Sequence, residues 1–240
     1  MIDDAGDFDL LVLPELASSG YVFQDRDELA SCAEKAGSGE FSAMLLEKAA
    51  SHQAYIVGGF PERDGDRIFN SCLLAGPEGM LAVYRKAHLF MDEKRIFDPG
   101  DLEFTVIETR MGRIGMLICF DWAFPEAWRL LALQGADIVA HPSNLVTSYA
   151  QQAVPSHALC NGYFIVTANR TGTERGVSFS GRSFISGRRG EILQMSDPGF
   201  TGTHILSVDL SLARDKMVTE GNHLLDDRRP YLYKGLDVTT

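Results

Sequence analysis

Residues 114–126 read Ile-Gly-Met-Leu-Ile-Cys-Phe-Asp-Trp-Ala-Phe-Pro-Glu, a stretch that joins a buried strand to the start of a helix. The apolar run through Ile118 has the length and composition of a strand, and Pro125 suits the first turn of a helix. Cys119 therefore lies at a strand-to-helix junction. A thiol there meets free backbone N–H groups, which can lower its pKa and receive an oxyanion, although a buried inert cysteine is the commoner case.

Strands and helices are predicted on both sides of this stretch by the spacing of apolar residues. Further strand-length runs occupy residues 10–13, 55–57, 72–74, 81–84, 104–107, 138–140, 164–167 and 205–208. Helical spacing is found at 41–49 and 127–134, and more weakly at 149–160, where Pro155 interrupts it. Tight turns at 77–79, 110–112 and 187–190 predict hairpins. The mixture indicates an α/β (α+β) fold in which helices cover sheets.

The length and charge of the chain restrict the classes of protein to consider. A chain of 240 residues, 45% of them hydrophobic, suits a single domain over residues 1–240 with a sizeable core. The 22 basic and 33 acidic residues give a net charge of −11, which argues against nucleic acids and membrane surfaces as partners. No apolar run approaches the roughly 18–20 residues of a membrane span. An acidic start in place of a signal peptide predicts a cytoplasmic protein.

Four cysteines, at positions 32, 72, 119 and 160, are few for this length. They show no C-x-x-C spacing, so neither a disulfide framework nor a zinc ribbon is expected. H-E-x-x-H and comparable ligand spacings are also missing from the sequence, which disfavours a metal hydrolase. A cysteine–histidine hydrolase stays open as an alternative, but it would leave Glu15 and Lys86, described next, without a role.

Two other apolar runs end in charged residues. Glu15 follows the run at 10–13, and Lys86 follows the run at 81–84. Desolvation among apolar neighbours would lower the pKa of Lys86, and a nearby carboxylate would keep it cationic. Glu93 lies in the irregular segment after Lys86. Each of these residues alone is most simply a surface charge, but three strand ends bearing Glu, Lys and Cys in this order favour a catalytic site.

The sequence around these three residues resembles the nitrilase or carbon–nitrogen hydrolase superfamily. The motifs that carry the resemblance lie at residues 13–16 and 19–21, 84–90, 118–126, 135–137, 141–144, 169–172 and 227–230. They cover nearly the whole chain in the order typical of the family. One departure is the start, since family chains usually have a strand and a helix before the strand that leads to Glu15.

The resemblance implies a four-layer αββα sandwich of the nitrilase type, without the family's first strand and helix. It makes Glu15 the general base, Lys86 the cationic stabiliser and Cys119 the nucleophile of a catalytic triad. Glu93 matches a fourth active-site carboxylate, which would orient Lys86 or the amide nitrogen of the substrate. No metal or organic cofactor is needed, and a homodimer or higher homo-oligomer is expected.

The expected substrate contacts surround the nucleophile. The backbone N–H of Phe120 would hold the oxyanion together with Lys86. Trp122 and Phe124 follow it closely and would wall the acyl pocket, although ordinary core packing explains them equally well. The polar candidates are Asn144, Tyr21 and, with less reason, Arg170 and Arg182.

The expected reaction is hydrolysis of a non-peptide C–N bond in a small linear amide, through a thioester on Cys119, with release of ammonia or an amine. N-carbamoyl amines and aliphatic nitriles are rival substrates, since the triad serves all three. His157-Ala158 resembles a form found in family branches similar to carbamoylputrescine amidases. A further alternative is an inactive, truncated relative that acts as a scaffold.

Overall fold

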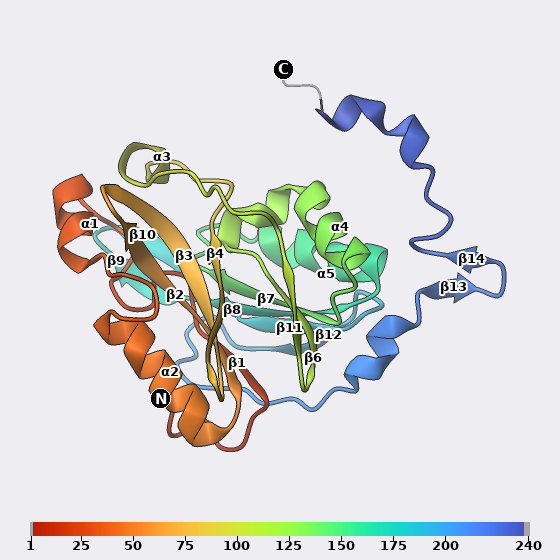
Figure 1. Cartoon of the computed structure of the whole chain (residues 1–240), viewed down its shortest axis with the longest axis horizontal. Coiled ribbons are helices and arrows are strands. Elements are labelled where there is room, and N and C mark those ends of the chain that lie inside the picture. The colour runs from red at the N-terminus through yellow and green to blue at the C-terminus, as the bar shows by residue number, and fades with distance from the viewer. Residues whose placement is uncertain (1, 238–240) are drawn as a thin grey trace.

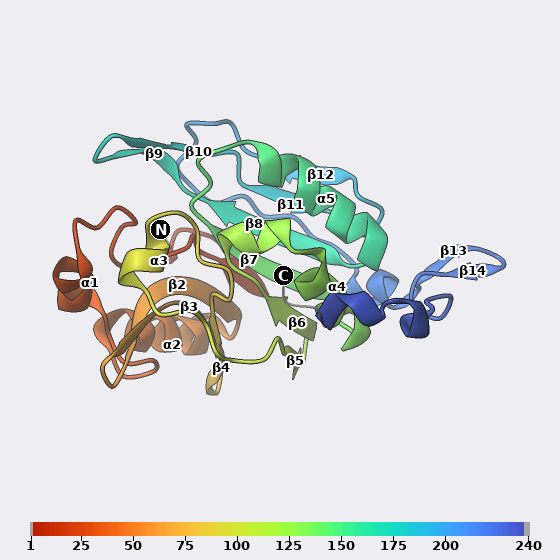
Figure 2. The same cartoon turned by 90° about the horizontal axis from the view of Figure 1, so that it is seen from above.

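The computed structural model describes residues 2–237 and shows two β-sheets packed face to face between helices (Figures 1 and 2). The first sheet has the strand order β1-β2-β3-β4. Its strands are β1 (Leu10–Val12), β2 (Tyr55–Asp64), β3 (Arg67–Gly76) and β4 (Gly79–Arg85). β1 pairs with β2 in parallel, and the other pairs are antiparallel.

The second sheet has the order β12-β11-β8-β7-β6-β5. Its strands are β5 (Val106–Thr109), β6 (Gly112–Met116), β7 (Ile138–Ser143), β8 (Phe164–Asn169), β11 (Phe184–Ser186) and β12 (Ile192–Met195). The central strands β6, β7 and β8 are parallel. Their carboxyl ends therefore share one edge of the sheet, where α/β proteins gather functional groups.

The alternation of side chains along each strand builds the layers. Leu11 and Ile56 face α2 (Glu40–His52), which packs on the outer side of the first sheet. The next residues, Val12 and Val57, face the second sheet. Between the sheets the sulfur atoms of Cys72 and Met116 lie 3.8 Å apart.

Two helices, α4 (Pro125–Leu133) and α5 (Tyr149–Asn161), cover the outer face of the second sheet (Figure 2). The order helix, sheet, sheet, helix is the αββα arrangement expected from the sequence. The smaller elements are α1 (Arg26–Cys32), α3 (Glu93–Ile96), β9 (Thr171–Glu174), β10 (Val177–Ser180), β13 (Met217–Thr219) and β14 (Asn222–His223). Short 3-10 helices lie at Cys119–Ala123, Leu210–Arg214, Pro230–Leu232 and Lys234–Asp237. None of the helices within residues 2–237 is long and apolar enough to cross a bilayer.

The local predictions are mostly confirmed. Hairpins form at all three predicted turns, and α4 begins at Pro125. α5 forms in spite of Pro155, because Ala150, Val154 and Ala158 bury one face of it against the sheet. The predicted strand at 205–208 is wrong: the segment is irregular, and Ile205 is 52% exposed, so it lacks the packed neighbours that hold a strand.

Two glycines bring catalytic candidates close to the sheet. A Cβ atom at Gly59, in β2, would lie 2.7 Å from the Cα of Glu15 and 2.6 Å from the backbone nitrogen of Leu16. A Cβ at Gly100 would collide with the backbone carbonyl of Arg85 and lie 2.7 Å from the carbonyl oxygen of Lys86. The segments that carry Glu15 and Lys86 therefore lie so close to Gly59 and Gly100 that no residue with a side chain fits at either position.

Gly59→Ala is expected to destabilise the protein by about 1–3 kcal/mol, because the obstructing atoms are backbone and cannot rotate away. Urea unfolding followed by circular dichroism measures this loss. Gly199→Ala is the matched control, since a Cβ there meets no atom within 4 Å. Equal stability of the two variants would show that the close approach at Gly59 does not constrain the fold.

Candidate active site

The structure brings Glu15, Lys86 and Glu93 into one buried cluster. The Nζ of Lys86 donates to Oε1 of Glu15 over 2.7 Å and to Oε1 of Glu93 over 2.8 Å. Glu15 follows β1, Lys86 follows β4, and Glu93 begins α3. The three residues are between 1% and 4% exposed. Three segments that are distant in sequence are thus joined through one ammonium group.

Burial and charge shift the pKa values of this cluster in ways that suit proton transfer. Desolvation raises the pKa of Glu15, and the attraction of Lys86 opposes it only in part. Desolvation alone would lower the pKa of Lys86, but the two carboxylates together outweigh it and raise the pKa. Lys86 therefore stays cationic, while Glu15 is a stronger base than an exposed glutamate.

Cys119 is buried at the turn between β6 and α4, with a φ of 43°, in the left-handed region that is strained for residues other than glycine. Desolvation and the charge of Glu15 raise the pKa of the thiol well above its usual value. Lys86 and the backbone N–H of Asn144 lower it in part. The resting residue is therefore a thiol that needs a base, unlike the pre-ionised cysteine that the junction alone would suggest.

Three buried acceptor atoms in or beside this cluster have no hydrogen-bond donor among residues 2–237. They are Oε2 of Glu15, Oδ1 of Asn144 and Oδ1 of Asn70, whose amide nitrogen donates to Glu15. The amide nitrogen of Asn144 donates to the backbone oxygen of Glu15 over 2.8 Å, which joins the two residues. Buried oxygens without a donor are rare in folded proteins and are typical of sites where another molecule supplies the proton.

Tyr21, a predicted substrate contact, lies beside Glu93. Its hydroxyl donates to Oε1 of Glu93 over 2.7 Å, and burial raises the pKa of the phenol. The backbone N–H of Phe90 donates to the other oxygen of Glu93. Both oxygens of Glu93 are therefore engaged within the protein, an arrangement that favours a role in holding Lys86.

The aromatic candidates form a cluster in the segment that follows Cys119. The ring of Phe120 makes contacts with Phe90, Trp122 and Phe124, at centroid distances of 4.9–6.1 Å. Phe124 also stacks on His88. The two arginine candidates differ, because Arg170 is paired with Glu174 and lies over Phe179, whereas no ion pair or ring contact of Arg182 is found among residues 2–237.

Asn70 and Asp121 are site residues that the sequence did not point to. Asn70, on β3, donates to Oε1 of Glu15 over 2.7 Å. Asp121 accepts from the backbone N–H of Ile118 and from the hydroxyl of Tyr84 through its Oδ2, each over 2.8 Å. Asp121 therefore links the turn that holds the thiol to the strand that leads to Lys86. No local sequence pattern indicates that either residue belongs to the site, because their hydrogen-bond partners lie 3 to 55 residues away in the sequence.

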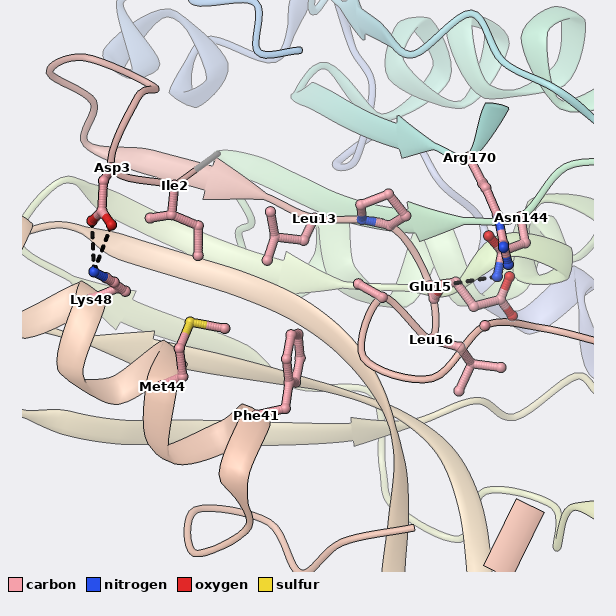
Figure 3. Close-up of a pocket in the computed structure, with 13 residues that line it drawn as sticks. Ile2, Asp3, Leu13, Glu15, Leu16, Phe41, Met44, Lys48, Asn144 and Arg170 are labelled. Atoms are coloured by element: carbon pink, nitrogen blue, oxygen red, sulfur yellow. Dashed lines mark hydrogen bonds and ion pairs between the residues drawn. The ribbon is translucent and has the colours of Figure 1, made fainter. Parts of the chain in front are cut away.

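A cavity of about 550 Å³ adjoins the cluster (Figure 3). Asp3 and Lys48 pair at one end of it, while Glu15, Asn144 and Arg170 gather at the other. Its middle is apolar and is lined by Ile2, Leu13, Phe41 and Met44. Neither Lys86 nor Cys119 lines this cavity, so it borders the cluster from the side of α2. No group of three or more metal-ligating side chains is found in the described part of the chain.

Comparison with known proteins identifies relatives over most of the chain. The sequence model described as carbon–nitrogen hydrolase matches residues 2–216. A nitrilase of Pyrococcus abyssi is 44% identical over 93% of this chain and 86% of its own length. An (R)-stereoselective amidase of a Pseudomonas species is 37% identical over 79% of this chain and 69% of its own length. The crystal structure of a carbon–nitrogen hydrolase from Helicobacter pylori superposes with a TM-score of 0.85 at 28% identity, over 98% of this chain and 88% of that one.

Asp121→Leu is expected to lower the free energy of unfolding by about 2–6 kcal/mol, because it leaves two buried donors unpaired at about 1–3 kcal/mol each. Asp121→Asn should cost much less. Its amide oxygen can still accept from Ile118 and Tyr84, and its amide nitrogen can donate to Nδ1 of His88, which faces Asp121 at 2.7 Å. Urea unfolding of both variants measures the difference. Equal destabilisation would contradict the proposed link through Oδ2.

Proposed function

Since the chain belongs to the carbon–nitrogen hydrolase family, we propose that it hydrolyses the C–N bond of a small linear carboxamide through a thioester on Cys119. The observation that carries the choice of amide is the pair of buried acceptors, Oε2 of Glu15 and Oδ1 of Asn144, that find no donor among residues 2–237. A carboxamide nitrogen brings two N–H donors to such a site, and a nitrile nitrogen brings none.

The first step is attack by the sulfur of Cys119. Oε2 of Glu15 takes the thiol proton, and the raised pKa of this carboxyl supports its use as a base. The S–C bond forms as the electron pair of the C=O bond moves onto oxygen. Lys86 and the backbone N–H of Phe120 stabilise the oxyanion.

The second step breaks the C–N bond. The electron pair of the oxyanion returns to form the thioester carbonyl, and the nitrogen leaves as ammonia with the proton held by Glu15. Glu15 then removes a proton from water as the water oxygen bonds to the thioester carbon. The electron pair of the resulting oxyanion re-forms the C=O bond, the C–S bond breaks, and the sulfur takes the proton back from Glu15. The products are the carboxylic acid and the free thiol, so a single carboxylate serves both half-reactions.

Glu93 acts in this scheme through Lys86. Oε1 of Glu93 and Oε1 of Glu15 accept hydrogen bonds from the same ammonium group, at 2.8 and 2.7 Å, and together they fix its position. Tyr21 and the Phe90 backbone hold Glu93 in turn. The aromatic residues Phe120, Trp122 and Phe124 are proposed to wall the acyl group, which favours uncharged acyl chains.

N-carbamoyl amines are the second candidate substrates, since their terminal NH₂ offers the same two donors and the chain carries the His157-Ala158 form. Nitriles are disfavoured by the donor count, although the similar Pyrococcus protein bears the name nitrilase. An inactive scaffold is disfavoured because the buried charges of Glu15, Lys86 and Glu93 are costly to a fold that makes no use of them.

Ammonia release should be measured on matched propionyl and butyryl amides, N-carbamoyl amines and nitriles. We expect turnover of amides or carbamoyl amines to exceed that of nitriles by at least about tenfold, because the nitrile leaves the two acceptors unpaired. Cys119→Ala should lower kcat by about 10⁴-fold or more. Mass spectrometry of the quenched enzyme should show the acyl mass on the peptide containing Cys119.

Cys160→Ala is the control, because Cys160 is exposed and is not part of the buried cluster. It should retain the activity of the wild type. Turnover that survives in Cys119→Ala would overturn the mechanism, and faster hydrolysis of nitriles than of either amide class would overturn the assignment of substrate.

A further inference from the structure

The carbonyl oxygen of Cys119 is held by a buried side chain that the mechanism above does not use. His141 lies on β7, beside the strand β6 that leads to the nucleophile. Its Nε2 is 3.0 Å from the carbonyl oxygen of Cys119. The imidazole is fully buried, and the edge of the Trp128 ring system packs against it.

The partners of His141 define which nitrogen carries the hydrogen. A carbonyl oxygen only accepts, so Nε2 must be the donor. On the opposite side, Nδ1 is 3.1 Å from the hydroxyl of Thr167 on β8, which can donate to it. Desolvation lowers the pKa of His141 to about 4. At neutral pH the ring is therefore uncharged and supplies one N–H, directed at the nucleophile's own peptide group.

The planar trans geometry of the peptide determines where the N–H of Phe120 points. The C=O of Cys119 and the N–H of Phe120 belong to the same peptide unit and point in opposite directions. With the oxygen held toward the buried His141, the N–H is directed away from it. Within residues 2–237 no acceptor is found for this N–H, so it is free to meet a ligand.

The orientation of this peptide is not guaranteed by the backbone alone. Cys119 has a φ of 43°, a conformation that costs about 1–3 kcal/mol for a residue other than glycine. Rotation of the Cys119–Phe120 peptide unit changes ψ of Cys119 and φ of Phe120, so the positive φ of Cys119 does not prevent it, and such a rotation would exchange the N–H for a carbonyl oxygen. A carbonyl oxygen facing the reacting carbon would repel the developing negative charge instead of stabilising it.

We propose that His141 is a positioning residue for the oxyanion site: by donating to the carbonyl of Cys119, it keeps the N–H of Phe120 directed at the oxygen that becomes negative. The proposal rests on the proposed function for the identity of that oxygen. It assigns to His141 no contact with substrate and no proton transfer.

A simple aldehyde tests this without the need for turnover. Propionaldehyde adds to the Cys119 thiol: the S–C bond forms, the C=O π pair moves onto oxygen, and the thiol proton ends on that oxygen. The thiohemiacetal oxygen occupies the oxyanion site. Its affinity is measured as protection of Cys119 from iodoacetamide, in a background in which the exposed Cys32 and Cys160 are replaced by serine.

His141→Leu removes the donor, and His141→Gln offers an amide N–H at the position of Nε2. We expect His141→Leu to weaken aldehyde protection and to lower kcat by about 10²-fold, the effect of losing one oxyanion donor, with KM within about threefold. His141→Gln should recover at least tenfold of both losses. The rate of alkylation of Cys119 without aldehyde should stay within about twofold, since alkylation builds no oxyanion.

Thr167→Val provides a second variant that keeps the ring and removes the nearer of the two hydroxyls beside Nδ1, at 3.1 Å, while the hydroxyl of Ser143 remains at 3.4 Å. It should show a smaller loss, of about two- to tenfold. A folded His141→Leu variant with aldehyde affinity equal to the wild type would overturn the inference, as would equal impairment of the Leu and Gln variants. Protection that depends on His141 in a protein that hydrolyses no amide would support the inference and contradict the proposed function.

Discussion

The ammonium group of Lys86, held between two buried carboxylates, is the interaction on which the site depends. Moving three charges out of water is costly, and removing one partner of such a set leaves an uncompensated charge. The cluster is tolerated because each charged group is paired within 2.8 Å and Asn70 and Tyr21 add further hydrogen bonds. It also joins the ends of β1 and β4 to α3, so the contacts that form the candidate active site also stabilise the fold.

The turns that carry Glu15, Glu93 and Cys119 are also strained. Positive φ values are found at Leu16, directly after Glu15, at Met91, two residues before Glu93, and at Cys119 itself. Such conformations persist only where the surroundings over-determine them. Around Cys119 the surroundings include hydrogen bonds from other strands, from Tyr84 to Asp121 and from His141 to the carbonyl of Cys119. The strain at Cys119 is thus offset by side chains from other strands.

The sequence predicted the parts of this site that depend on local pattern. Strand ends bearing Glu15, Lys86 and Cys119, the helix start at Pro125 and three hairpin turns are all readable from neighbouring residues. Asn70, Asp121 and His141 were not predicted as site residues, because their roles depend on which strands lie side by side. The segment at 205–208 shows the converse of this limit. Its apolar residues resemble a strand, but no strand within residues 2–237 pairs with it.

The close packing behind Glu15 and Lys86 bears on how such a site could be re-engineered. Gly59 contacts the backbone of the segment that carries Glu15, and Gly100 contacts that of the segment that carries Lys86, where even one carbon atom does not fit. Substitutions at these two positions would therefore cost stability, whatever substrate was selected for. Aromatic side chains such as Trp122 and Phe124, which pack on Phe120 and not on these glycines, are the better positions to vary, and a focused library can omit positions 59 and 100 from the start.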